Sequence, residues 1–240
     1  MVGVASPRLL VISPHFDDAV LSCGALLAGQ QETVVCTVFA AAPRTPMQTS
    51  WDTKSGFSDS SAAMRARAIE DEQALAVLGA HPVHLPFCDA QYGESPSHEM
   101  LVEALARVVA EVPASTVFIP LGLFHSDHVL VSNACVAVLE RLPERAAHAY
   151  EDVPYRNMTG LVHARLRELP QLDMAAHDGH AHGDAAGAAR REAAKQEALR
   201  AYASQLRAFD CAASEPAFIA ERHWRLTTLR KRHEWRGPLL

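Results

Sequence analysis

The chain has 240 residues, of which 49% are hydrophobic and 21% charged, and its formal net charge is −6 at pH 7. Because this length is enough for one large α/β domain, we expect residues 1–240 to form a single domain. The scattered charges argue against nucleic acid or an anionic membrane surface as the main partner. No apolar run approaches the ~20 residues of a spanning helix and no signal peptide is evident, which predicts a cytoplasmic protein without integral membrane association.

Strands and helices are predicted to alternate along the chain. Residues 8–13 form an apolar run typical of a buried strand, and residues 19–29 are predicted to follow as a helix. Further strands are predicted at residues 33–40, 83–87, 116–120 and 148–151. Further helical stretches are predicted at residues 62–78, 127–142 and 188–209. This alternation predicts an α/β fold in which helices cover both faces of a mainly parallel, doubly wound sheet.

Two segments are predicted to be loop excursions. Residues 42–61 carry Trp51 and Phe57 among turn-forming residues, so they are expected either to wall a crevice at the end of the second strand or to form a surface loop. Residues 177–187 are rich in histidine and glycine. That composition suits either a metal-binding tract or a solvated insert.

The turn after the first strand carries the strongest chemical signal. His15, Asp17 and Asp18 stand between a buried strand and a helix, which is where α/β sheets build their sites. Imidazole nitrogen and carboxylate oxygen suit Zn²⁺ or another divalent transition ion. Either aspartate can instead cap the helix by accepting its free amides. No glycine-rich phosphate loop follows this strand, which argues against a nucleotide-dependent enzyme.

A second cluster, His125, Asp127 and His128, follows the predicted strand at residues 116–120. If the two strands are neighbours where a doubly wound sheet reverses direction, both turns open into one crevice. His15, Asp18 and His128 can then meet. Three protein ligands with one position left for water are the pattern of a catalytic metal rather than a structural one.

The two clusters also carry a family resemblance. PHFDD at residues 14–18 and HSDH at residues 125–128 resemble the PHPDD and HPDH signatures of the PIG-L/LmbE-like family of zinc-dependent N-deacetylases. Arg67 and Glu70 resemble the Arg-x-x-Glu helix of that family, and KQEALRAYASQ at residues 195–205 resembles its late segment. Phe16 and Ala19 depart from the usual motif. SPHFDDAVLSCG together with YEDVPY resembles a bacterial branch that includes deacetylases of natural-product sugars.

The resemblance implies a single-domain, Rossmann-like LmbE fold and one Zn²⁺ or other divalent ion per chain on His15, Asp18 and His128. The ion would lower the pKa of its bound water and polarise an acetyl carbonyl. Asp17 would be the general base that takes the proton from water and delivers it to the leaving amine. His125, if protonated, would stabilise the oxyanion. Asp127 would orient a histidine, with helix capping as its alternative.

Two residues are predicted to contact the substrate. Arg67 matches a family arginine and can bind sugar hydroxyls or a phosphate, although a helical pair with Asp71 explains it as well. Asp89 follows the strand predicted at residues 83–87 and is placed to accept hydrogen bonds from sugar hydroxyls. Ordinary turn chemistry explains Asp89 equally well.

The predicted function is hydrolysis of the N-acetyl amide of an N-acetylglucosamine-type sugar on a conjugate. The alternatives are an amidase of a thiol conjugate or another non-sugar amide, and a non-catalytic carbohydrate-binding module. Retention of Asp17 with all three candidate ligands argues against the binding module. The expected partner is a small acetamido-sugar conjugate, and a homo-oligomer is compatible with the sequence. The carrier of the sugar can be an antibiotic aglycone, another glycan, a lipid or a thiol.

Overall fold

The computed structural model describes residues 9–169, 172–177 and 185–228, in which seven strands form one mixed sheet. The strand order is β3-β2-β1-β4-β5-β7-β6, with β5–β7 and β6–β7 antiparallel and the other pairs parallel. The strands are β1 (Leu9–Ser13), β2 (Thr33–Thr37), β3 (Ala80–His84), β4 (Thr116–Pro120), β5 (Ala146–Tyr150), β6 (Leu172–His177) and β7 (His223–Thr228).

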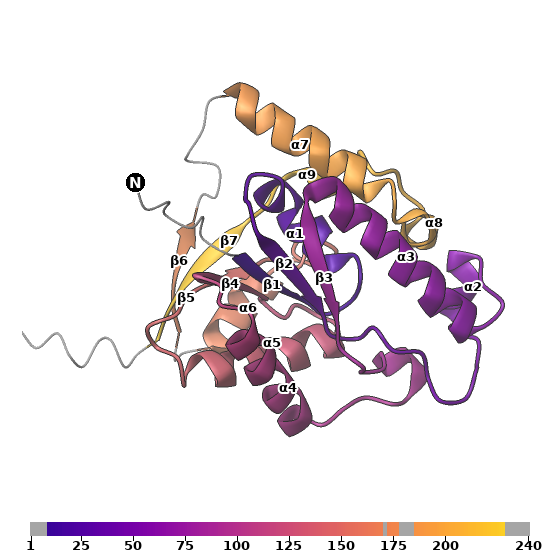
Figure 1. Ribbon diagram of the computed structural model, residues 1–240, viewed down its shortest axis with the longest axis horizontal. Helices are drawn as coiled ribbons and strands as arrows, with labels where there is room; N and C mark the ends of the chain where they lie inside the picture. Colours follow the sequence, from indigo (N-terminus) through magenta and orange to yellow (C-terminus); the bar gives the residue numbers. More distant parts are fainter. Residues whose placement is uncertain (1–8, 170–171, 178–184, 229–240) are drawn as a thin grey trace, which may run out of the picture.

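Helices cover both faces of this sheet, with α1, α3 and α7 on one side and α4, α5 and α6 on the other (Figure 1). Their bounds, in chain order with one 3₁₀ turn, are α1 (Asp18–Leu27), α2 (Ser50–Ser55), α3 (Ser60–Leu78), η1 (Ala90–Tyr92), α4 (His98–Glu111), α5 (Ser126–Leu139), α6 (Leu161–Glu168), α7 (Ala185–Leu199), α8 (Ala203–Phe209) and α9 (Pro216–Ile219). Within the described residues, no helix has the length and apolarity needed to cross a membrane.

Strand β1 shows why the sheet is buried on both faces. Alternate side chains of a strand point to opposite faces. Leu10 and Ile12 accordingly join the core under α4 and α5, whereas Leu9 and Val11 join the core under α1, α3 and α7. All five residues of the strand are buried, as a continuous apolar run predicts for a parallel sheet covered twice. The predicted doubly wound α/β fold is confirmed.

The sheet reverses direction beside β1, and this places the two polar clusters together. Strand β1 pairs in parallel with β2 on one side and with β4 on the other, with Leu9 opposite Thr116. The chain leaves β1 toward α1 and leaves β4 toward α5, so both turns lie at the same edge of the sheet. Crevices at such switch points are the usual ligand sites of doubly wound folds. The condition stated above, that the strands before the two polar clusters are neighbours, is therefore met by β1 and β4.

Several predicted bounds differ from the observed ones. Strand β3 begins at Ala80, three residues before the prediction, and includes Pro82. Proline lacks an N–H donor, and it is tolerated here because β3 lies at the edge of the sheet. Strands β6 and β7 were not predicted, and their antiparallel pairing makes the sheet mixed. The helix predicted at residues 188–209 is divided into α7 and α8.

The two predicted loops have different outcomes. Residues 42–61 contain the short helix α2 and the first residues of α3, and Trp51 of this excursion lines the pocket described below. The excursion therefore contributes to the wall of the crevice through Trp51, the first of the two arrangements considered, whereas Phe57 is not among the residues that line the pocket. Of the histidine-rich tract at residues 177–187, residues 178–184 lie outside the described part of the chain, and the prediction of a metal-binding or solvated tract stays untested there.

Candidate metal centre

A serine, and not an aspartate, satisfies the start of α1. Asp17 stands at the N-cap position, but within the described residues its side chain makes no capping hydrogen bond. The amide of Ala19 instead donates to Ser13 Oγ at 3.0 Å, and that hydroxyl donates to the carbonyl of His15 at 2.6 Å. Capping, the alternative explanation for the two aspartates, is therefore supplied by Ser13. The carboxylate of Asp17 is therefore not used as a cap, and Asp18 Oδ2 accepts the amide of His15 at 2.9 Å instead of an amide of the helix.

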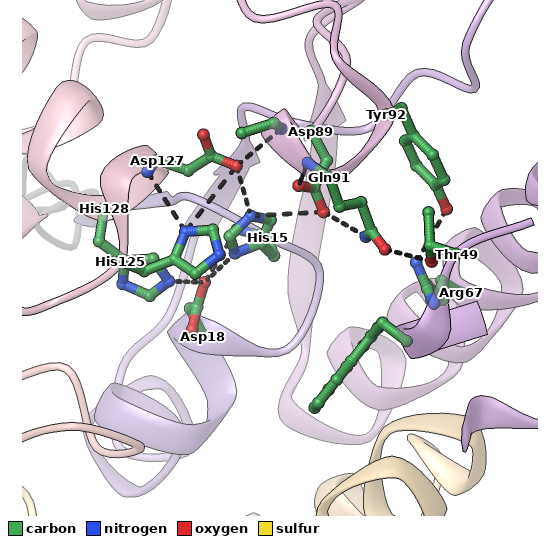
Figure 2. Close-up of polar contacts among 12 residues, drawn as sticks. His15, Asp18, Thr49, Arg67, Asp89, Gln91, Tyr92, His125, Asp127 and His128 are labelled. Atoms are coloured by element: carbon green, nitrogen blue, oxygen red, sulfur yellow. Dashed lines mark hydrogen bonds and ion pairs between the residues drawn. The ribbon is translucent and has the colours of Figure 1, made fainter. Parts of the chain in front are cut away.

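The three predicted metal ligands meet at the switch point (Figure 2). Asp18 Oδ2 lies 3.1 Å from His15 Nδ1 and 3.2 Å from His128 Nε2. One ligand atom from each of the three residues lies within 4.8 Å of the other two. Asp18 and His128 are buried, and His15 is half-buried. Two imidazole nitrogens and one carboxylate oxygen form a donor set that fits Zn²⁺ and similar divalent ions.

The other nitrogen of each histidine contacts a second carboxylate. His15 Nε2 lies 3.2 Å from Asp127 Oδ2, and His128 Nδ1 lies 2.6 Å from Asp152 Oδ1. Carboxylates in this position fix the tautomer and the ring orientation of a metal-binding histidine. Asp127 thus has the contact that the resemblance implied for it. It is part of the first turn of α5, but it does not cap that helix, because His125 Nδ1 accepts the Asp127 amide at 3.2 Å.

Asp152 is a site residue that sequence reasoning missed. Its Oδ2 accepts the amides of Gly122 and Leu123 at 2.9 and 3.0 Å, while its Oδ1 faces His128. The side chain is fully buried. Its hydrogen bonds to the two amides join the segment after β5 to the segment after β4. The available signal was the YEDVPY segment, whose aspartate follows a predicted strand just as the two metal motifs do.

The charges of the cluster shift the pKa values of its members in opposite directions. Burial, reinforced by the negative charge of Asp18, raises the pKa of Asp17 to about 7. Burial alone would lower the pKa of His128, but the carboxylates of Asp18 and Asp152 outweigh it and raise that pKa to about 9. Protons on imidazoles therefore balance the buried carboxylates. A divalent cation supplies the same balance.

The surroundings of His125 favour its neutral form, and its role as an oxyanion donor stays a prediction. Burial lowers the pKa of His125, and positive charge on His15 and His128 lowers it further. Because Nδ1 accepts the Asp127 amide, the single proton of the neutral ring is on Nε2. A neutral His125 can still donate one hydrogen bond to developing negative charge.

A pocket with a cavity of about 200 Å³ opens in front of these groups. His15, Asp17, Asp18, His125 and His128 form its polar end. Its remaining walls are mostly aromatic and apolar, with a few polar side chains, and consist of Phe16, Phe39, Trp51, Met64, Arg67, Asp89, Gln91, Pro154, Tyr155, Gln205 and Phe209. An apolar pocket with a few convergent polar groups and perturbed pKa values is the usual form of an active site.

Arg67 lines this pocket, but the predicted helical pair with Asp71 is wrong. Its Nη2 donates to Asp52 Oδ1 at 2.9 Å, and its Nη1 donates to Tyr92 Oη at 3.3 Å. Asp71 instead contacts His84 at 3.0 Å and accepts from Tyr202 at 2.8 Å. Arg67 turns toward α2 and η1, whose positions the helical spacing could not reveal. Its Nε is buried and has no hydrogen-bond partner among the described residues.

The Asp89 side chain accepts hydrogen bonds within a turn, which was the alternative to its predicted contact with the substrate. Its carboxylate accepts the Gln91 amide at 2.9 Å and the Gln91 side chain at 2.6 Å, which begins η1. It also lies 3.7 Å from His15 Nε2 and lines the pocket. Thr49 donates to the same Gln91 side chain at 2.7 Å, so a polar chain joins the start of α2 to the metal centre (Figure 2).

The late motif closes the far wall of the pocket. Trp51 Nε1 donates to Gln205 at 3.1 Å, and the Trp51 ring packs edge-on against Phe209. Ser204 donates through its amide and its hydroxyl to the two oxygens of Glu70, at 2.9 and 2.6 Å. Glu70 thus accepts a free amide in the first turn of α8. This contact joins the Arg-x-x-Glu motif on α3 to the late motif that ends on α8.

Asp152→Asn is expected to weaken binding of a divalent ion by about 10- to 100-fold, because it removes the carboxylate that fixes His128. Titration with Zn²⁺ against a competing chelator measures this affinity. Asn retains an oxygen for the amides of Gly122 and Leu123, so we expect the fold to survive. Unchanged affinity in the variant would show that Asp152 only supports the backbone.

Comparison with protein families gives one match. The family model described as PIG-L, GlcNAc-PI de-N-acetylase, matches residues 10–139, which is more than half of the chain. The matched range includes both metal motifs. No curated protein matches the chain.

Solved structures share the fold. Teicoplanin deacetylase Orf2, in a zinc-inhibited form, superposes with a TM-score of 0.77 at 23% identity, over 92% of this chain and 98% of that one. The A40926 pseudoaglycone deacetylase Dbv21 gives 0.71 at 24% identity, over 94% and 98%. The N,N'-diacetylchitobiose deacetylase of Pyrococcus horikoshii gives 0.52 at 17% identity, over 84% and 71%. At these identities the likeness shows the fold alone.

Proposed function

Because the chain belongs to the PIG-L family of GlcNAc-PI de-N-acetylases, we propose that it hydrolyses the N-acetyl amide of an N-acetylglucosamine-type sugar, releasing acetate and a free amine. The observation that carries the proposal is Asp17. This carboxylate is buried and makes no capping hydrogen bond to α1 within the described residues. It lines the pocket together with His15, Asp18 and His128. Proteins of the same fold named as deacetylases of teicoplanin, A40926 pseudoaglycone and diacetylchitobiose support the choice of an acetamido sugar.

In this proposal His15, Asp18 and His128 hold one divalent ion, with Zn²⁺ the first choice. Such an ion, when bound, lowers the pKa of a coordinated water and polarises the acetyl carbonyl. Asp17 takes the proton of the attacking water and later gives it to the leaving amine, so one carboxyl group acts first as base and then as acid. Its pKa of about 7 without an ion reflects burial beside Asp18.

The remaining polar groups position the reaction. His125 donates from Nε2 to the oxygen that becomes negative as the carbonyl is attacked, which is the task of an oxyanion hole. Asp127 and Asp152 hold the rings of His15 and His128. Arg67 and Asp89 line the pocket and are proposed to contact the sugar, Asp89 after exchanging Gln91 for a hydroxyl.

The substrate is proposed to be a conjugate rather than a free sugar. Besides its polar end, the pocket has apolar walls that include Trp51 and Phe209, and these can contact a part of the substrate other than the acetyl group. Binding energy from a distant part of a substrate can orient the scissile amide, so truncated substrates lose kcat as well as affinity. Free N-acetylglucosamine is therefore expected to be turned over poorly.

Purified protein is expected to contain about one divalent ion per chain and to release acetate from a conjugated 2-acetamido sugar. Removing the ion with a chelator should abolish acetate release, and adding Zn²⁺ should restore it. Elemental analysis and acetate quantification measure the two quantities on the same sample. Unchanged acetate release from metal-free protein would contradict the proposed chemistry. Release of acetate from an N-acetylated thiol conjugate, but from no sugar, would favour the amidase alternative.

A further inference from the structure

Phe124 occupies a backbone conformation that L-residues rarely adopt. It stands between β4 and α5, directly before His125, and its φ is +61°. The amide of His125 donates to the carbonyl of Leu123 at 2.7 Å and closes a γ-turn around Phe124. A γ-turn with positive φ is rare and strained, and glycine is the residue that adopts it without penalty. The backbone therefore gives no reason for a phenylalanine here.

Packing gives no reason either. The Phe124 side chain is 62% exposed, the highest value among the exposed large hydrophobic residues of the described chain. Burial of an aromatic ring normally contributes to stability, but this ring remains mostly in water. A strained position with an exposed aromatic side chain contributes little to the stability of the free protein. Backbone outliers of this kind cluster at ligand sites, where the strain is part of function.

The exposed ring continues the wall of the pocket outward. Its centroid lies 5.4 Å from that of Tyr155, which lines the pocket. The Tyr155 ring in turn lies edge-on to His128 at 5.3 Å. Phe124 and Tyr155, which we call the aromatic rim, thus run from the metal centre to solvent. Tyr155 lines the pocket and Phe124 is the exposed ring beside it, so a carrier that extends from an acetamido group at the metal centre past Tyr155 can reach Phe124.

We propose that the aromatic rim is a subsite for an aromatic group attached to the acetamido sugar. The inference rests on the proposed deacetylase function and specifies the chemical class of the carrier. An aromatic carrier can stack on an exposed ring in the offset or edge-on geometries that aromatic pairs prefer. We infer that the substrate is the occupant, because the Tyr155 ring of the rim contacts His128 of the metal centre.

The test compares three 2-acetamido-2-deoxyglucosides that differ only at the anomeric position: methyl, cyclohexyl and phenyl. We expect kcat/KM for the phenyl glycoside to exceed that for the methyl glycoside about tenfold, with the cyclohexyl glycoside well below phenyl. Phe124→Asn should reduce the phenyl-to-methyl ratio to about one, because asparagine tolerates positive φ but lacks the ring. Phe124→Tyr should retain the ratio. Met100→Ala removes another exposed apolar side chain, on α4 and 52% exposed, and should leave the ratio unchanged.

Three results would overturn the proposal. A phenyl-to-methyl ratio unaffected by Phe124→Asn would show that the ring does not contact the carrier. Equal preference for cyclohexyl and phenyl glycosides would point to a general apolar contact, such as an acyl chain. A wild-type dimer that becomes a monomer in Phe124→Asn, measured by light scattering, would show that a second copy covers the ring.

Binding by calorimetry separates this inference from the proposed function. The phenyl-to-methyl affinity ratio and its loss in Phe124→Asn can be measured without turnover. If no glycoside releases acetate but the binding ratio behaves as expected, the deacetylase function fails and the aromatic subsite stands. If acetate is released but the binding ratio is one in the wild-type protein, the subsite fails and the deacetylase function stands.

Discussion

Asp17→Asn is expected to retain its divalent ion and to lose about 10²- to 10⁴-fold in kcat, the usual contribution of a general acid or base. The substitution keeps the shape of the side chain and removes only its ability to take a proton. Asp17 supplies no capping hydrogen bond within the described residues, so α1 should begin as before. Acetate release, metal content and thermal unfolding of the same preparation measure the three effects.

Asp18→Asn is the matched control, because it changes the neighbouring residue in the same way. Asp18 Oδ2 lies between His15 and His128, so this variant should lose the ion itself, and its activity should fall as a consequence. Saturating Zn²⁺ should recover part of the activity of Asp18→Asn and none of that of Asp17→Asn. If Asp17→Asn emptied the site and Asp18→Asn remained loaded, the two roles would have to be exchanged.

The polar end of the pocket could be predicted because its information is local. Each metal motif follows a short apolar strand, and parallel strands bring such turns to one edge of a sheet. The fold was predictable from the same alternation of strands and helices. Whether β1 and β4 are neighbours depends on long-range pairing, and only the structure establishes that His15 and His128 meet.

The parts that could not be predicted depend on contacts between distant segments. Asp152 lies 24 residues after His128 in sequence and contacts it only because β5 pairs with β4. Arg67 was assigned a partner within its own helix, but it pairs with Asp52 of α2, a helix hidden in a segment predicted to be a loop. The strained turn at Phe124 has no sequence signal, because a positive φ is expected at glycine and not at phenylalanine.

A buried ion pair whose residues do not line the pocket has the largest expected effect on stability. Lys195 of α7 and Glu221, just before β7, lie 2.9 Å apart, and their side chains are 0% and 1% exposed. The two oxygens of Glu221 also accept the amides of Ala25 and Leu26 in α1, at 2.7 and 3.1 Å. The pair thus joins α7, α1 and the approach to β7. Gly24 provides the space for the lysine, because a Cβ there would lie 2.7 Å from Lys195 Cγ.

Lys195→Met is expected to lower the free energy of unfolding by about 3–5 kcal/mol, because it leaves the buried charge of Glu221 without its partner. Urea denaturation measures the change. Arg200→Ala removes the exposed pair with Glu197 and should change the same quantity by less than about 1 kcal/mol.

Adding Glu221→Gln to Lys195→Met removes the unpaired charge while keeping an acceptor for one α1 amide, so it should restore part of the loss. If the double variant were less stable than Lys195→Met by the full cost of Glu221→Gln alone, the charge pairing would not be the source of the effect, and the lysine would act through packing against Gly24.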